Sequence, residues 1–450
     1  MRKKLDIFDK LYFLIGLPWL FLMLYTSRMY TEIKVVMLVV LFSIAYFEII
    51  SKKIKLNRRC CYFVVVFVLY SILSLLYGIL LGYEFDIGKD YALLQYYVVT
   101  PICIIVFGAV FSYKRNRVHF IWEALKYLML ALTVLDVIRV VLYMMGIDPP
   151  YLQFIMMASD GYQELLTLRV SNEMTLMFMV PVFVYLLMNP DTKSKKDRFI
   201  YLIIVVFGLI YSIMSGRKML EISVFLSFIV SYIYANGRFS LKRIINRKTI
   251  KVVLICVLFV LLFSSVFKKL SELMGIENIT ELAYKTMVDG FSSGSEGVDK
   301  REGNTFALID LWLESPLWGN GLNSYAEGSL ANSQTKWSYE VVYVAWLAQT
   351  GLIGATLLII PIVYILKRLK YKFLKYRDRK YFAFAIGFAF FIFCGASNPM
   401  VYLVWPWSIC LMLCSEEDVF SIVNTKNNIN YDESSYHSWR PRDTYSLRKQ

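Results

Sequence analysis

Long apolar runs separated by polar stretches dominate the pattern along this chain of 450 residues. A helix that crosses a membrane needs roughly 20 consecutive, mostly apolar residues. Twelve runs approach that length, namely residues 11–26, 33–50, 60–82, 91–112, 119–145, 173–188, 199–214, 219–235, 251–266, 340–366, 381–395 and 401–414. The pattern therefore predicts an all-α integral membrane protein, a polytopic bundle of about 12 transmembrane helices.

One long polar interruption divides the chain into four parts. Residues 1–266 hold the first nine predicted spans, and residues 267–337 form a single long loop. Residues 338–414 hold the last three spans, and residues 415–450 form a polar tail that we expect to be disordered. Loops of such length in a compact protein commonly carry function, so the chemistry is expected in loop 267–337.

The distribution of charge predicts the orientation of the chain. The composition is 58% hydrophobic and only 18% charged, which excludes an ordinary soluble protein. The net charge of +15 does not indicate nucleic-acid binding, because the basic residues gather in alternate loops. These loops are residues 51–59, 113–117, 193–198, 238–251 and 367–380. Basic loops stay in the cytoplasm, so we predict cytoplasmic termini and an outer position for loop 267–337, which has a net charge of −4.

The second half of the long loop predicts an amphipathic helix at the membrane surface, with apolar residues spread from Thr305 to Leu313. Arg301 and Asn304 lie at its expected start. Trp312 and Trp318 suit the boundary between membrane and water. Arg301 alone would be an ordinary solvated charge, and its place at the start of this helix makes it a candidate for anion binding.

A tight turn is predicted after this helix. Ser315 and Pro316 end the helix, and the string continues Leu317-Trp318-Gly319-Asn320-Gly321. Two glycines one residue apart permit a reversal of the chain and a close approach of backbone to a ligand. A plain loop reversal explains them equally well, and no strand precedes them, so a nucleotide-binding fold is not supported.

The tenth predicted span begins with Tyr339 and Glu340, and Gly351 and Gly354 interrupt it. A carboxylate at the membrane surface tends toward a raised pKa, which suits a general base. A negative charge favoured by the positive end of the helix dipole is the alternative interpretation of Glu340.

Two cations, Arg217 and Lys218, occupy the short outer turn between the seventh and eighth spans. They either extend to the membrane interface or bind an anion held there. The two histidines, His119 and His437, fall on the predicted cytoplasmic side. The predicted topology therefore excludes a histidine-based triad or a histidine-ligated zinc on the outer face.

Three charges fall inside the fifth predicted span: Lys126, Asp136 and Arg139. Asp136 and Arg139 are spaced i, i+3 on one face. A structural ion pair inside the bundle is favoured, and a polar path for a ligand head group is the alternative.

With these residues together, the chain resembles the bacterial O-antigen polymerase and ligase superfamily, specifically the Wzy-type polysaccharide polymerases. The resemblance rests on the many spans, the single long outer loop, and two strings of residues. The first is Pro316-x-x-Gly319-x-Gly321 after an arginine and a tryptophan-bearing helix, and the second is Glu340 followed by Leu347-x-x-x-Gly351-x-x-Gly354. The ligase branch commonly has a His-Asn pair where this chain has Tyr339-Glu340, which favours the polymerase branch.

The resemblance implies a GT-C-like, metal-independent glycosyltransferase without a cofactor in the bacterial inner membrane. Such enzymes move a growing glycan from undecaprenyl pyrophosphate onto a lipid-linked repeat unit. It also implies that Arg217, Arg301 and Glu340 are catalytic. The implied substrate-binding residues are Lys218, Asn304, Trp312, Trp318, Gly319, Gly321 and Tyr339.

Partners and competing functions complete the prediction. The lipid-linked oligosaccharide is the expected substrate, and chain-length regulators and flippases are the expected protein partners. A ligase-like glycan transferase and a flippase or transporter of lipid-linked oligosaccharides remain the alternatives. O-antigen, capsule and exopolysaccharide all remain open as the product.

Overall fold

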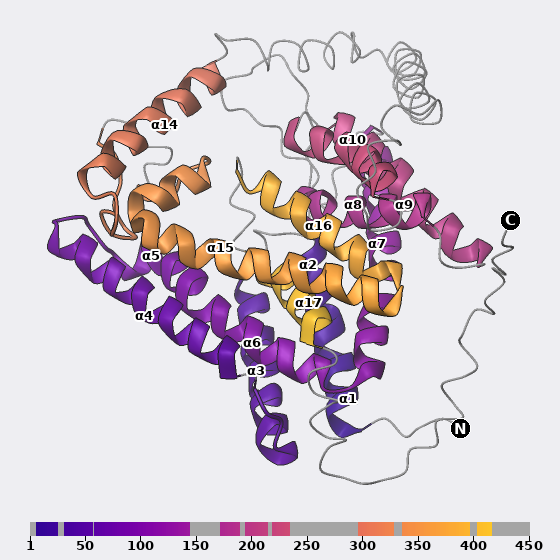
Figure 1. Cartoon of the computed structure of the whole chain (residues 1–450). Coiled ribbons are helices and arrows are strands. Elements are labelled where there is room, and N and C mark those ends of the chain that lie inside the picture. Colours follow the sequence, from indigo (N-terminus) through magenta and orange to yellow (C-terminus); the bar gives the residue numbers. More distant parts are fainter. Residues whose placement is uncertain are drawn as a thin grey trace, which may run out of the picture.

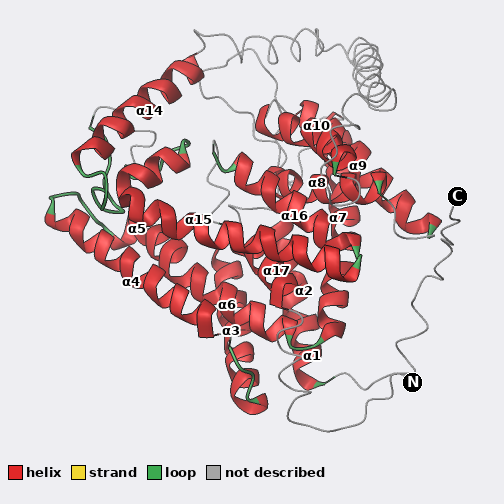
Figure 2. Ribbon diagram, in the orientation of Figure 1, coloured by secondary structure: helices red, strands yellow, loops and turns green. Residues whose placement is uncertain are grey.

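The computed structural model describes residues 6–25, 31–56, 58–144, 172–189, 194–214, 218–234, 296–327, 335–396 and 403–415. Within these ranges the protein is 85% helical and contains no strand (Figure 2). The prediction of an all-α chain is therefore confirmed for the described part. The predicted span 251–266, the loop up to residue 295 and the tail from residue 416 onward lie outside it.

The helices follow one another along the chain with short connections (Figure 1). The first group is α1 (Ile7–Leu11), the π-helix η1 (Tyr12–Gly16), α2 (Leu17–Tyr25), α3 (Thr31–Lys52), α4 (Arg58–Leu80), α5 (Ile87–Leu94), the π-helix η2 (Gln95–Val99), α6 (Thr100–Ser112) and α7 (Arg115–Met144). The second group is α8 (Glu173–Met188), α9 (Lys195–Met214), α10 (Lys218–Ile233), α14 (Glu296–Glu314), α15 (Val342–Tyr376), α16 (Arg379–Cys394) and α17 (Val404–Ser415).

Five helical runs in the described ranges are long and apolar enough to cross a membrane. They are Ile7–Tyr25, Glu32–Lys52, Cys60–Leu80, Ile87–Ser112 and Val342–Tyr376. Shorter apolar helices occupy the places of three further predicted spans, in α8, α10 and α17. The chain thus has the helices of a polytopic membrane protein.

Both π-helices lie directly before a proline. Pro18 follows η1 and Pro101 follows η2, each at the second position of the next α-helix. Proline has no N–H to donate and its ring crowds the preceding turn. A widened π turn absorbs that crowding without ending the helix, so each run stays continuous across its proline.

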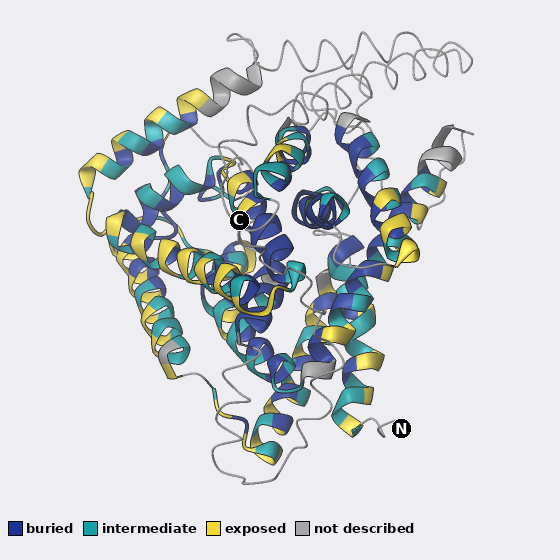
Figure 3. Cartoon of the chain, turned by 45° about the vertical axis from the view of Figure 1, so that its right-hand side comes forward, coloured by how far each residue is buried: buried dark blue, intermediate teal, exposed yellow. Residues whose placement is uncertain are grey.

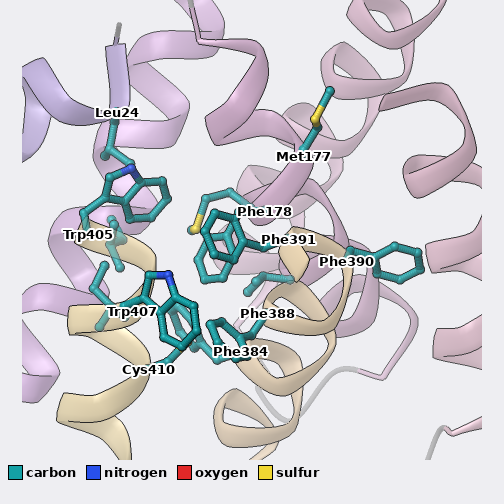
Figure 4. Packing of buried hydrophobic residues seen from close by; sticks show 14 of the residues in the cluster. Leu24, Met177, Phe178, Phe384, Phe388, Phe390, Phe391, Trp405, Trp407 and Cys410 are labelled. Atoms are coloured by element: carbon teal, nitrogen blue, oxygen red, sulfur yellow. The ribbon is translucent and has the colours of Figure 1, made fainter. Parts of the chain in front are cut away.

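Helix α8 lies at the centre of the described bundle and packs most extensively against α16 and α10. It is buried without interruption from Thr175 to Leu186, as expected for a helix that is apolar on all sides. Its Phe178 ring meets Phe384, Phe391 and Trp405 (Figure 4), with centroids 5.1 Å apart for the Trp405 pair. Aromatic packing between distant helices therefore builds the core.

Large apolar side chains remain exposed on the outer helices, as in α3 and α4 (Figure 3). Examples are Val36, Leu69, Leu73 and Ile359. Exposed apolar faces of this extent are typical of surfaces that meet lipid rather than water.

A group of six charged residues joins the start of α1 to the end of α3 and the start of α7. We call it the ionic cluster; its members are Asp6, Asp9, Glu48, Lys52, Lys114 and Arg117. The Arg117 guanidinium donates to both oxygens of the fully buried Glu48, at 2.9 and 2.7 Å, and to Asp9 at 2.7 Å. The predicted basic loops 51–59 and 113–117 therefore meet at one end of the bundle.

The other end of α4 meets a different part of the chain. Gly78 lies against Gly321, and Asn323 donates to the carbonyl of Tyr83 at 3.0 Å. The predicted outer loop thus packs on the end of α4 opposite to the ionic cluster. The described residues keep the two predicted sides apart.

Candidate functional site

The turn of residues 315–321 packs against a break in α15, and we call this pair the turn–break junction. The break is at Gly351, whose φ of 60° and ψ of −169° are not helical. It separates a short half-helix, residues 342–350, from a long helix of residues 352–376. The two glycine-bearing strings singled out in the sequence therefore contact each other.

Two N–H groups beyond the break bond to the turn. In an unbroken helix Leu352 and Ile353 would donate to carbonyls four residues earlier. They donate instead to the carbonyls of Pro316 at 3.0 Å and Leu317 at 3.2 Å. The turn thus supplies the acceptors that the broken helix lacks.

The carbonyls released by the break are also satisfied by the turn. Ala348 accepts from the N–H of Asn320 at 3.0 Å, and Gln349 accepts from the N–H of Gly321 at 2.9 Å. The buried Asn320 side chain donates to the carbonyl of Leu311 at 2.5 Å. Buried backbone groups need such partners, so the turn completes α15 and ties α14 to it.

Glycine is required at this junction because backbone meets backbone. A Cβ on Gly351 would lie 2.4 Å from the carbonyl oxygen of Leu317, and one on Gly319 would lie 2.3 Å from that of Gln349. Gly319 and Gly351 both have positive φ, which side chains disfavour. The contact explains these glycines without a ligand.

Helix α4 holds the junction from the side. The Tyr70 hydroxyl donates to the carbonyls of Trp318 at 3.2 Å and Thr350 at 2.5 Å, one on each side of the junction. Eight residues on, the Cα of Gly78 lies 2.3 Å from where a Cβ of Gly321 would stand. The turn is therefore fixed between α4 and α15.

A buried amide links the junction to the segment before α15. The Gln349 side chain donates to the carbonyls of Ser324 at 3.1 Å and Trp337 at 2.9 Å. The Trp337 indole N–H donates to Asp90 at 2.7 Å. These bonds fix the backbone of residues 335–341 against α5.

Glu340 is exposed on this fixed segment. On one side, the buried Tyr339 hydroxyl accepts from the N–H of Ala326 at 2.9 Å, and burial raises the pKa of that hydroxyl. On the other side, the N–H of Val342 donates to the Glu340 carbonyl at 3.0 Å. The backbone that carries this carboxylate is thus held before and after it, which is the preorganisation a reactive group needs.

An exposed ion pair adds a further tie. Lys336 donates to Glu84 at 2.9 Å, beyond the end of α4. The Lys336 ammonium lowers the pKa of the Glu84 carboxyl, and Glu84 raises the pKa of Lys336. Exposed pairs contribute little to stability, so the pair chiefly orients the segment.

Helix α14 begins earlier than predicted, which corrects the position of Arg301. The apolar pattern placed Arg301 at the helix start, but α14 already runs from Glu296, because charged residues are adequate helix formers. Asn304, Leu308 and Leu311 are buried on the face that packs toward the half-helix. Position 301 lies one turn before Asn304, and its side chain is outside the described residues.

The last turn of α16 brings two predicted site segments together. The Cys394 thiol donates to the carbonyl of Met219 in α10 at 3.6 Å. The Tyr343 hydroxyl, at the start of the half-helix, donates to the carbonyl of Ile392. The first residues of α10 and of the half-helix therefore contact the same turn of α16.

The predicted anion-binding residues stand next to this meeting point in the sequence. Arg217 directly precedes α10, and Lys218 is its first residue. Arg217 and the side chain of Lys218 lie outside the described residues. Their proximity to Glu340 is supported only through the backbone neighbours Met219 and Tyr343.

The two tryptophans differ in environment. Trp312 is half-buried and its indole donates to the carbonyl of Pro316 at 3.0 Å, whereas Trp318 is exposed. Gly319 and Gly321 are buried in backbone contacts. Binding of substrate by these four residues stays a prediction, as it does for the buried Asn304.

The predicted ion pair inside the bundle is confirmed. Arg139 donates to the fully buried Asp136 at 3.1 Å, and Asn172 donates to its other oxygen at 2.6 Å. Lys126 is separate and pairs with Asp197 at 2.8 Å. The pair ties α7 to the start of α8.

Sequence reasoning did not single out Tyr70, Asp90 and Gln349. Tyr70 is one of many aromatic residues in an apolar run, and Asp90 resembles an ordinary charge in the first turn of a helix. Gln349 did carry a signal, since an amide beside Gly351 in an apolar run needs buried partners. Their contacts join segments about 250 residues apart.

No family model, curated protein or solved structure matches this chain. Within the described ranges, no group of three or more His, Cys, Asp or Glu side chains is placed to hold a metal ion.

Proposed function

We propose that this chain is a polysaccharide repeat-unit polymerase with about 12 spans, cytoplasmic termini and its site at the outer face of the bacterial inner membrane. The donor is a glycan on undecaprenyl pyrophosphate, and the acceptor is a lipid-linked repeat unit. Flippases and chain-length regulators are its proposed protein partners.

The proposed reaction is a single glycosyl transfer. An acceptor hydroxyl attacks the anomeric carbon of the donor, and the bond from that carbon to the pyrophosphate oxygen breaks with its electron pair. Glu340 takes the hydroxyl proton. Arg217 and Arg301, with Lys218, stabilise the negative charge that develops on the departing lipid pyrophosphate.

One observation carries this proposal: Glu340 is an exposed carboxylate on a fixed backbone. The half-helix that follows it meets the same turn of α16 as the start of α10, directly after Arg217. A base and a cation at one membrane-level position suit transfer from a lipid pyrophosphate.

The test compares Glu340→Gln, Arg217→Ala and Arg301→Ala in cells that lack the native copy, at matched protein levels. Glycans are resolved by length on a gel. Loss of a general base lowers the rate by about 10²–10⁴-fold, so long polymer is expected to disappear and single lipid-linked units to accumulate. Glu327→Gln, which changes another exposed carboxylate of the outer loop, is the matched control and is expected to keep long polymer.

Persistence of long polymer in all three variants would reject these site residues. A flippase makes the opposite prediction about location, because its loss traps repeat units on the inner leaflet. Digestion with an added glycosidase distinguishes the two, since it reaches only units at the outer face.

A further inference from the structure

The depth of the turn 315–321 can be measured along α4. The apolar part of α4 runs from Cys60 to Leu80. At 1.5 Å per residue it is about 30 Å long, which equals the thickness of the hydrocarbon layer. Tyr70 is its middle residue, and Gly78 lies about 12 Å nearer to the outer end.

The contacts place the turn beside the outer half of this helix. Tyr70 donates to the carbonyl of Trp318, and its ring lies 3.0 Å from where a Cβ of Gly354 would stand. At the other limit, Gly321 lies against Gly78. The turn therefore extends between the levels of Tyr70 and Gly78, both inside the apolar length of α4.

Exposed apolar side chains occur at this level on the turn itself. Leu317 is 59% exposed and Trp318 is 61% exposed. Nearby positions of α4 and α15 are also apolar and exposed, as at Leu73 and Leu352. The outward side of the turn thus continues the apolar surface of the spanning helices.

The polar backbone of the turn faces inward and is satisfied there. The carbonyls of Pro316, Leu317 and Trp318 accept from Leu352, Ile353 and Tyr70 respectively. Non-helical backbone is tolerated at membrane depth only when protein or water satisfies its polar groups. The break in α15 supplies that protection.

We propose that residues 316–321 form a re-entrant turn inside the hydrocarbon layer, with Leu317 and Trp318 in contact with lipid chains. The surface is an interface with the bilayer interior rather than with water or a second protein. The long helix of residues 352–376 is about 37 Å long and crosses the membrane without the half-helix. This inference does not depend on the proposed reaction.

The test is the accessibility of a nitroxide spin label at position 317. The full chain, with its seven native cysteines replaced by alanine and Leu317→Cys added, is labelled and placed in vesicles of phosphatidylethanolamine and phosphatidylglycerol. Relaxation by oxygen, which concentrates in hydrocarbon, is compared with relaxation by a water-soluble nickel chelate. Leu69→Cys, at the middle of α4 and 55% exposed, is the lipid reference. Lys89→Cys, with a side chain 70% exposed beyond α4, is the water reference.

The label at 317 is expected to resemble the label at 69, with relaxation by oxygen several-fold stronger than by nickel. Equal access of nickel to positions 317 and 89 would overturn the proposal and place the turn in water. Trp318→Cys repeats the measurement if Leu317→Cys does not fold.

Discussion

The ionic cluster and the turn–break junction hold opposite ends of α4 by different means. At the ionic cluster, side-chain charges from α1, α3 and α7 neutralise one another around the buried Glu48. At the junction, almost every bond involves backbone, and the side chains that contribute, such as Tyr70 and Asn320, are uncharged. The first end depends on charge balance, and the second depends on backbone shape.

This difference teaches where each end is vulnerable. Removing one member of a buried charge group leaves the others desolvated and unpaired. Removing a hydrogen-bonding side chain at the junction leaves most of its bonds intact, whereas adding one methyl group there forces the two backbones apart. Substitutions at the two ends therefore give different rankings of damage.

The largest effect is expected from Arg117→Met, which leaves Glu48 and Asp9 without their guanidinium partner. Breaking a buried ion pair costs about 3–5 kcal/mol, measured as the free energy of unfolding in mixed micelles. The double variant Arg117→Met with Glu48→Leu is expected to recover part of this loss. Lys89→Met, which removes only an exposed pair, is the control and is expected to change little; an equal loss there would contradict the interpretation.

Gly351→Ala is expected to cost about 1–3 kcal/mol from backbone strain, and more from the clash with Leu317. The same unfolding measurement reports it. Gly303→Ala is the matched control, because a Cβ there meets nothing within 4 Å and Gly303 lies inside α14. The control is expected to be neutral or slightly stabilising, and indistinguishable results for the two variants would remove the argument for the junction.

The smallest effect is expected from Tyr70→Phe, which deletes a hydroxyl shared between two carbonyls. A hydrogen bond contributes about 0.5–1.5 kcal/mol, so a loss of about 1–2 kcal/mol is expected in the unfolding free energy. Tyr62→Phe, on the same helix but 72% exposed, provides the comparison. A larger loss at Tyr62 would show that α4 does not hold the junction through Tyr70.

Much of the fold could be predicted because apolar runs are a local signal. The described helices α3, α4, α8 and α16 fall on predicted runs almost to the residue. The start of α14 was wrong, because its first two turns are polar and carry no apolar pattern. The central place of α8 also could not be predicted, since every long run looked equally apolar.

The site was harder to predict because its contacts are distant in the chain. Glycines at 319, 321 and 351 did mark the two segments, and a loop reversal was one of the stated interpretations. Their mutual contact could not be predicted, since a close backbone approach looks the same in sequence whether its partner is a ligand or a helix. The roles of Arg217, Arg301 and Glu340 rest on chemistry that only activity can test.

The bond between Tyr70 and Thr350 also has a consequence for the order of folding. These residues are 280 positions apart, so α4 leaves the ribosome long before its partner exists. Contacts across such a separation carry a high loop-closure cost and form late. The face of α4 around Gly78 must therefore wait, unfilled, through the synthesis of most of the protein, and closure of the junction is a late step in maturation.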